Sequence, residues 1–179
     1  MKNIIHIFGA AGSGTSTLGK RIAEEFGFKF MDTDDYFWMP NNPPYTVKRL
    51  EQERIELMLR DINNTENAVI SGSLTDWGDI LIPYFTLAVR VYTDTETRIE
   101  RLKNRERAHF GSRIDKGGDM YENYFEFIDW ACRYDTADVS IRSKAKHDEW
   151  QKLLQCELIT VEGTNIFELD MEIIKQKIR

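Results

Sequence analysis

Short apolar runs alternate along the chain with longer segments whose apolar residues recur at helical spacing. Runs of this length and β-branched content predict buried strands, and they occupy residues 4–8, 28–31, 68–71, 87–92 and 157–161. Segments with one apolar face predict amphipathic helices, and they occupy residues 15–26, 47–63, 95–107, 120–134, 144–154 and 166–178. Because strands and helices alternate, we expect one α/β domain, a three-layer sandwich with a five-stranded parallel sheet.

Residues 9–16, GAAGSGTS, follow the first predicted strand and open the first predicted helix. The phosphate-binding loop, or P-loop, has the pattern Gly, four residues, Gly, Lys, then Ser or Thr. Glycines allow backbone N–H groups to surround phosphate oxygens, and the helix adds its positive N-terminal end. The candidate nucleotide-binding residues are therefore Gly9, Ala11, Gly12, Ser13, Gly14, Thr15, Ser16 and Thr17.

The residue at position 15 departs from this pattern, because a threonine stands where lysine is expected. The lysine places a positive charge on the β- and γ-phosphates, whereas threonine offers only a hydrogen bond. Three alternatives follow: another cation fills the role, the loop binds nucleotide without turnover, or catalysis is slow.

Carboxylates and small residues follow the second and third predicted strands, at the edge of the sheet where ligands bind. Asp32 and Asp34 would share one side if the strand continued. Either could bind Mg²⁺, together with the Ser16 hydroxyl, and Asp34 could accept the proton of an acceptor hydroxyl. The other interpretation is a polar turn whose aspartates cap the next segment. Asp76, after the third strand, is a helix cap or a ligand contact.

The densest basic stretch is the helix predicted over residues 95–107 and the glycine-containing loop after it. Arg101 and Arg105 share a helix face, and Arg113 lies in the loop. Phosphoryl transfer needs such charges, because its transition state is stabilised by charge and position. We expect these three arginines to be catalytic and Arg98 to be structural, while Arg133 and Arg142 remain open. The alternative for all of them is a solvated face of ion pairs.

The net charge of −6 and the pI of about 5.2 argue against nucleic acid as a partner. No apolar run approaches the roughly 18 residues of a membrane span. The two cysteines, Cys132 and Cys156, form no metal-binding motif and are expected to be free core thiols. These observations predict a cytoplasmic protein that contacts neither nucleic acid nor a membrane.

Taken together, these motifs resemble the P-loop small-molecule kinases of the adenylate kinase and shikimate kinase group. GAAGSGTST resembles their GxxGSGKxT loop, DTD at 32–34 resembles the shikimate kinase DxD, and RIERLKNR resembles the helix before the lid. TVEGTNIFEL resembles the stretch after the last strand, near the adenine, which makes Gly163 a candidate contact. The resemblance implies ATP and Mg²⁺ as cofactors, an acceptor-binding insert at about 36–64 and a lid at about 106–142.

The resemblance predicts an ATP-dependent kinase of a small-molecule acceptor such as a nucleoside monophosphate, acting as a monomer or homodimer. Two stretches depart from the group: DGFPR of adenylate kinases and the three glycines of shikimate kinases are both missing after the third strand. A nucleotide-binding protein without transfer activity is the main alternative. An NTPase or a kinase of nucleic-acid ends is the least favoured.

Overall fold

The computed structural model describes residues 2–164 and 169–178 of the chain. The strands are β1 (Asn3–Gly9), β2 (Lys29–Asp32), β3 (Asn67–Ser71), β4 (Leu87–Tyr92) and β5 (Glu157–Glu162). The α-helices are α1 (Thr15–Phe26), α2 (Thr33–Phe37), α3 (Glu51–Asn63), α4 (Thr95–Phe110), α5 (Tyr121–Cys132), α6 (Lys144–Trp150) and α7 (Leu169–Lys175). Short 3₁₀ helices are η1 (Asp79–Tyr84), η2 (Gly111–Ile114) and η3 (Gln151–Leu153).

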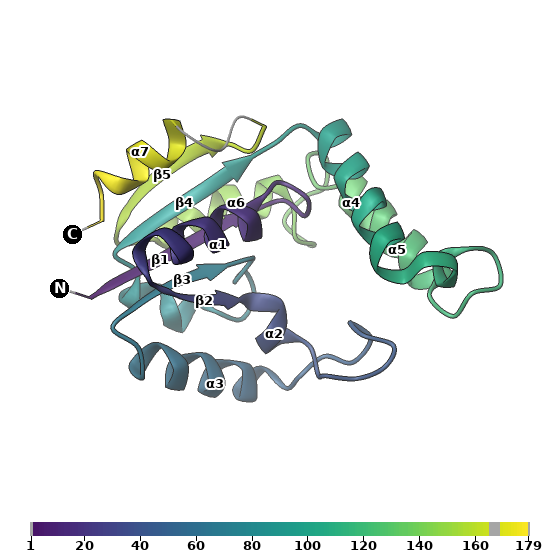
Figure 1. Ribbon diagram of the computed structural model, residues 1–179, viewed down its shortest axis with the longest axis horizontal. Helices are drawn as coiled ribbons and strands as arrows, with labels where there is room; N and C mark the ends of the chain where they lie inside the picture. The colour runs from purple at the N-terminus through teal and green to yellow at the C-terminus, as the bar shows by residue number, and fades with distance from the viewer. Residues whose placement is uncertain (1, 165–168, 179) are drawn as a thin grey trace.

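The strands form one parallel sheet in the order β2-β3-β1-β4-β5 (Figure 1). This confirms the five-stranded parallel sheet predicted from the alternation of strands and helices. After β1 the chain crosses to β2, at one edge of the sheet. After β3 it crosses in the opposite direction to β4, on the other side of β1. The carboxyl edge around β1 is therefore the switch point at which open α/β sheets bind ligands.

Alternate residues of β1 enter two separate cores, one on each face of the sheet. Ile4 and Phe8 pack with residues of α3, η1 and α6. Ile5 and Ile7 pack with residues of α1 and α7. Because both faces are covered by helices, the sheet residues are apolar on both sides, as the sequence of β1 already indicates.

The most local predictions are confirmed at the residue level. Helix α1 and strand β4 begin and end at the predicted residues. Gly27 ends α1 in the left-handed conformation with a φ of 67°, and the Asp94 carboxylate caps α4 by accepting a hydrogen bond from the Thr97 N–H.

Five of the six predicted helices have different bounds. Helix α4 ends at Phe110 and not at residue 107, and α5 covers Tyr121–Cys132 and not 120–134. Helix α3 begins at Glu51 and not at residue 47, because the preceding segment is extended against the chain after α2: the Met39 N–H donates to the Val47 carbonyl at 2.8 Å. The helix predicted over 144–154 ends at Trp150 and continues as η3. Of the helix predicted over 166–178, residues 166–168 lie outside the described residues, and α7 covers Leu169–Lys175.

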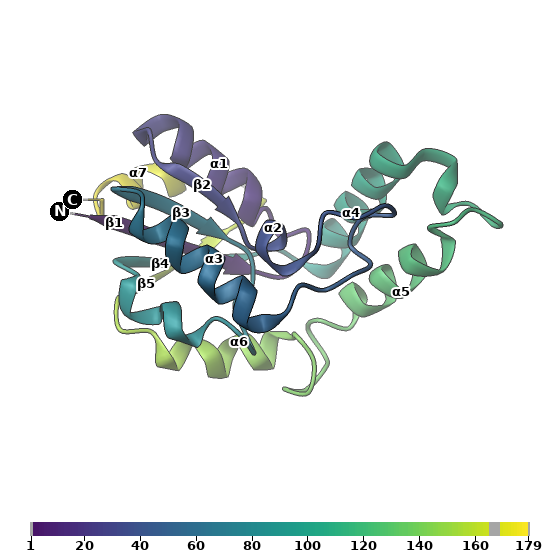
Figure 2. The ribbon, with the colours of Figure 1, turned by 90° about the horizontal axis from the view of Figure 1, so that it is seen from below.

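Helices α4 and α5 form a hairpin that extends away from the sheet, in the segment for which a lid is expected (Figures 1 and 2). The turn at its far end contains η2 and is closed by a hydrogen bond from the Met120 N–H to the Arg113 carbonyl. Within residues 2–164 and 169–178, every helix is too short or too polar to span a bilayer.

His147 and the two cysteines show how the helices after β4 pack. His147 is fully buried, and its ring pairs with Ser73 and Tyr134. Burial lowers the pKa of His147 to about 3, so the ring is neutral at physiological pH. Both cysteines are free as expected, yet Cys132 is exposed and therefore not a core thiol.

Candidate active site

The loop between β1 and α1 has the backbone conformation that phosphate binding requires. Gly12 and Gly14 have positive φ angles of 79° and 103°, and a Cβ at Gly12 would lie 2.7 Å from the Arg98 carbonyl oxygen. Only glycine fits such a position. Gly9 ends β1, and the Ala11 carbonyl accepts a hydrogen bond from the Arg98 side chain. The loop therefore rests on helix α4.

Two features of this loop leave polar groups without protein partners. Ser13 is fully buried, and its hydroxyl has no hydrogen-bond partner in the described part of the chain. Gly14 caps α1 without a side-chain hydrogen bond, so no side chain caps the helix that Thr15, Ser16 and Thr17 open. A buried hydroxyl and an uncapped helix N-terminus beside positive-φ glycines fit a bound phosphate group.

The Ser16 hydroxyl donates a hydrogen bond of 3.0 Å to the Asp32 carboxylate. Asp32 is the last residue of β2 and lies in register with Ser71, the last residue of β3. The carboxylate next to the loop thus comes from β2, since β3 ends in a serine. This pairing places together two of the three residues expected to hold a metal, Ser16 and Asp32.

The third, Asp34, does not share a strand face with Asp32, because the strand does not continue to it; the alternative, a turn in which an aspartate caps the next segment, is confirmed. The strand ends at Asp32, and Asp34 lies in the first turn of α2. The Asp32 carboxylate accepts a hydrogen bond of 3.1 Å from the Asp34 N–H and so caps this helix. Asp34 is therefore positioned by the turn of α2 and not by the sheet.

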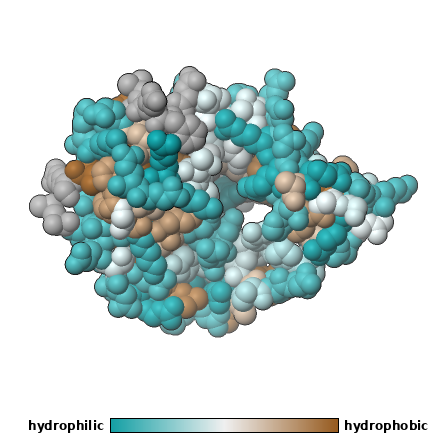
Figure 3. Space-filling view, in the orientation of Figure 1, coloured by the Kyte–Doolittle hydropathy of each residue, from teal (hydrophilic) through white to brown (hydrophobic). Residues whose placement is uncertain are grey.

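A hollow separates the body of the sheet from the α4–α5 hairpin (Figure 3). The pKa of Asp34 is raised by desolvation and by the neighbouring Asp32 carboxylate. The positive charges of Arg142 and Arg105 act in the opposite direction on the same carboxyl group. The fold thus brings Asp34 together with two arginines that are 71 or more residues away in sequence.

The arginines expected to be catalytic have different surroundings. Arg105 pairs with the adjacent Glu106, and its side chain is 60% exposed. Arg101 donates a hydrogen bond of 3.0 Å to the Gly163 carbonyl. Arg113 pairs with Asp119 at the far end of the hairpin and is not brought to the loop. Arg98 is fully buried, as a structural residue would be.

Gly163 lies directly behind the phosphate-binding loop. Its N–H donates to the Tyr92 carbonyl and its carbonyl accepts from Arg101, so both backbone polar groups are already paired. A Cβ at this position would lie 2.1 Å from both the Ser13 carbonyl oxygen and the Thr93 hydroxyl. Close packing therefore explains why residue 163 is a glycine. A contact between Gly163 and the adenine base stays a prediction.

We expect Gly163→Ala to destabilise the protein by about 2 kcal/mol, because overpacking of this size forces the loop or β4 to move. The melting temperature should fall by roughly 4–8 °C, and ATP should stabilise the variant less than it stabilises the wild type. Calorimetry with and without ATP measures both effects. Glu162→Ala, at an exposed neighbouring position, is the control, and an unchanged melting temperature in Gly163→Ala would contradict the packing role.

A pocket of about 240 Å³ opens beside Asp34, in the segment expected to bind the acceptor. Its lining residues come from α2 and the loop after it: Asp34, Asp35, Trp38, Met39, Pro40, Asn41, Pro44, Tyr45 and Arg49. The Trp38 and Tyr45 rings contact each other edge to face at 6.3 Å. Tyr45 has a positive φ of 61° and is 51% exposed, a strained conformation of the kind that clusters at ligand sites.

Arg49 gives this pocket a positive charge that no described carboxylate neutralises. Its guanidinium donates to the Tyr36 and Trp38 carbonyls at 3.0 and 3.3 Å. These contacts fix the arginine against the loop while leaving its charge available to an anionic group. The short helix α2, which creates the pocket wall, was not predicted, because five residues are too few for a periodic signal.

Asp76 is neither a cap nor part of this site. Its carboxylate accepts two hydrogen bonds from the Lys146 ammonium, at 2.6 and 2.7 Å, on the side of α6. Within residues 2–164 and 169–178, no group of three or more His, Cys, Asp and Glu side chains is placed to hold a metal ion by itself. A metal at Ser16 and Asp32 would therefore need further oxygens, such as those of phosphates and water.

Comparison with known proteins identifies a family model that matches this chain and proteins of similar sequence. A family model described as an AAA domain matches residues 5–120. The uncharacterized protein YqaC of Bacillus subtilis is 38% identical over 162 residues, which cover 90% of this chain and 89% of that protein. A cytidylate kinase of Archaeoglobus fulgidus is 31% identical over 113 residues, which cover 57% of this chain and 61% of that enzyme.

A solved structure of a shikimate kinase from Bacteroides thetaiotaomicron has a similar fold. The TM-score is 0.52 and the sequence identity is 14%, over 88% of this chain and 86% of that one. At this identity the likeness is one of fold.

Proposed function

The chain belongs to the AAA-domain family and has the fold of the P-loop small-molecule kinases, and we propose that it transfers the γ-phosphoryl group of ATP to a small acceptor. The observation that carries the proposal is the convergence of Ser16, Asp32, Asp34 and two arginines at the carboxyl edge of the sheet. This arrangement joins a phosphate cradle, a carboxylate base and positive charge, which are the parts that phosphoryl transfer needs.

The nucleotide would be held by the backbone of the loop from Gly9 to Gly14 and by the start of α1. Ser16 and Asp32 would hold Mg²⁺, whose charge offsets that of the phosphates when it is bound. Their mutual hydrogen bond of 3.0 Å already orients both oxygens beside the loop. The unpartnered Ser13 hydroxyl supports the same site, because a phosphate oxygen would satisfy it.

Asp34 would accept the proton of the acceptor hydroxyl as that oxygen attacks the γ-phosphorus. Its raised pKa makes the carboxylate a stronger base than an ordinary aspartate. The positive charges of Arg105 and Arg142 act on Asp34, and Arg105 would stabilise the charge on the transferred group. The hairpin that carries Arg105 would then act as the lid that excludes water.

The acceptor would bind in the pocket beside Asp34. Trp38 and Tyr45 offer flat surfaces on which a ring can stack, and Arg49 offers a charge for an anionic group. A nucleoside monophosphate combines both features, which makes it our first choice. The likeness to a cytidylate kinase supports the same class.

A nucleotide-binding protein without transfer activity is the second candidate, and Thr15 is the observation that favours it. Without the loop lysine, a nucleotide could bind through backbone N–H groups while transfer stays slow. The two candidates differ in a single measurable property, the release of ADP that depends on an acceptor.

We expect Mg·ATP to give ADP at a rate that rises when a pool of nucleoside monophosphates is added. A second pool of hydroxylated and acidic metabolites tests the other acceptors, and a coupled assay for ADP measures both. Ser16→Ala should lower the acceptor-dependent rate by at least about tenfold, because a contact to a charged ligand is lost. No release with either pool, while ATP still raises the melting temperature, would support the non-catalytic candidate.

A further inference from the structure

Arg142 differs from the other arginines near the hollow. In the described part of the chain its guanidinium makes no hydrogen bond and no ion pair, and its Nε is buried without a partner. Arg98 and Arg105 pair with carboxylates, and Arg101 donates to the Gly163 carbonyl. A buried cation without a partner is costly, so a ligand that supplied the missing negative charge would stabilise it.

The side chain of Arg142 is nevertheless held in place. Its guanidinium lies over the Trp130 ring, 4.4 Å from the centroid, which is a favourable cation–π distance. The next residue, Ser143, caps α6 and donates to the Asp138 carbonyl at 2.6 Å. The backbone and the side chain of Arg142 are thus both anchored, while its hydrogen-bond donors stay free.

The anchor lies next to the phosphate-binding loop. Trp130 precedes Ala131, and one nitrogen of the Arg98 guanidinium donates to both the Ala131 carbonyl and the Ala11 carbonyl of the loop. Arg142 also acts on the charge of Asp34, which is bonded through its N–H to Asp32 and so to Ser16. Contacts through Trp130 and an electrostatic interaction with Asp34 therefore link Arg142 to the phosphate-binding loop, which lacks a lysine.

We propose that Arg142 supplies the positive charge that the phosphate-binding loop lacks at Thr15, by contacting the transferred phosphoryl group. The inference rests on the proposed function. In the transfer step the bond from the γ-phosphorus to the bridging oxygen breaks, and a bond to the acceptor oxygen forms. The acceptor proton moves to Asp34. Arg142 stays protonated throughout, because a guanidinium does not release its proton in this pH range.

The central test is a rescue experiment at position 15. Arg142→Met keeps a side chain that can pack on Trp130 but removes the charge, and we expect it to lower kcat roughly 100- to 1,000-fold. Adding Thr15→Lys to Arg142→Met should restore at least about tenfold, because a lysine there reaches the same phosphates. Failure of Thr15→Lys to restore any activity would overturn the inference. A melting temperature near that of the wild type confirms that each variant is folded.

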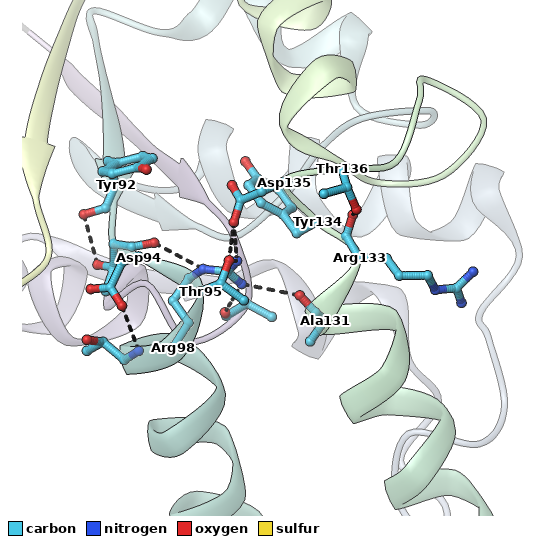
Figure 4. Close-up of polar contacts among 12 residues, drawn as sticks. Tyr92, Asp94, Thr95, Arg98, Ala131, Arg133, Tyr134, Asp135 and Thr136 are labelled. Atoms are coloured by element: carbon cyan, nitrogen blue, oxygen red, sulfur yellow. Dashed lines mark hydrogen bonds and ion pairs between the residues drawn. The ribbon is translucent and has the colours of Figure 1, made fainter.

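The control is Arg133→Met. Arg133 lies on the same connection but points away from the cluster of Arg98 and Asp135 (Figure 4), and it pairs with Asp129 on the surface. We expect its kcat and nucleotide affinity to equal those of the wild type. Equal losses in Arg133→Met and Arg142→Met would overturn a specific role for Arg142.

A binding measurement tests Arg142 without turnover. Calorimetry gives the ratio of the ATP and ADP affinities, and Arg142→Met should shift this ratio against ATP by about tenfold or more, because a contact to the γ-phosphate is lost. An unchanged ratio, together with a raised KM for the acceptor alone, would overturn the inference and make Arg142 an acceptor anchor. If the wild type shows no acceptor-dependent turnover, the proposed kinase function fails, whereas a shifted ratio would still support the contact of Arg142 with the γ-phosphate.

Discussion

Replacement of Asp34 by asparagine is expected to lower acceptor-dependent turnover by roughly 100- to 10,000-fold, the usual effect of removing a general base. The variant keeps the shape of the side chain but cannot take the acceptor proton. Nucleotide affinity should change little, since Ser16 and Asp32 remain paired beside the loop. The wild type should lose activity as the pH falls through the pKa of Asp34, which is raised above its ordinary value, and Asp34→Asn should lack this acid limb.

The same substitution should not destabilise the protein. The pKa of Asp34 is higher in the folded state than in the unfolded state, so the ionised carboxylate opposes folding once the pH exceeds the folded pKa. The neutral asparagine removes this opposition, and the melting temperature at pH 7 should stay equal or rise. Large losses of activity without losses of stability are typical of functional residues.

Measurements of kcat, KM and melting temperature between roughly pH 4 and pH 9 test the expected loss of activity and the expected stability of Asp34→Asn. Asp129→Asn is the control, because it removes the same charge from an exposed carboxylate that pairs with Arg133 on the surface. An Asp34→Asn protein with the kcat and pH profile of the wild type would exclude Asp34 as the base.

Replacement of Arg98 by methionine is expected to destabilise the fold by roughly 3–5 kcal/mol, because it leaves the charge of Asp135 without its partner. The guanidinium is fully buried and donates to Asp135 at 2.8 Å, to the Thr95 hydroxyl and to the Thr93 carbonyl (Figure 4). Its remaining donor group joins the phosphate-binding loop to the end of α5. The variant should therefore lose both stability and nucleotide affinity.

Urea unfolding measures the first effect and calorimetry with ATP measures the second. A double-mutant cycle with Asp135→Asn separates the ion pair from the bonds to the backbone. If the losses of unfolding free energy in the two single variants add up to the loss in the double variant, the ion pair contributes nothing measurable to stability. If Arg98→Met leaves nucleotide affinity unchanged while stability falls, the contact with Ala11 does not order the loop.

The sequence determined the local structure of this protein. The apolar period of α1, the stop at Gly27 and the cap at Asp94 depend on residues within one or two helical turns. The alternation of strands and helices predicted the parallel sheet, and the glycine spacing located the phosphate-binding loop. Asp32 ends β2 and Ser16 follows the end of β1, so both could be expected at the carboxyl edge of the sheet, where they meet.

Only the tertiary structure decided which polar groups of distant segments come together. Asp34 lies in the first turn of α2 because the Asp32 carboxylate caps that helix. Arg113 pairs with Asp119 at the tip of the hairpin. Arg142 came close enough to Asp34 for its charge to act on that carboxyl group, and His147 was buried against Ser73. A short window of sequence encodes periodicity and caps, whereas the partner of a charge depends on how helices far apart in the chain pack across the sheet.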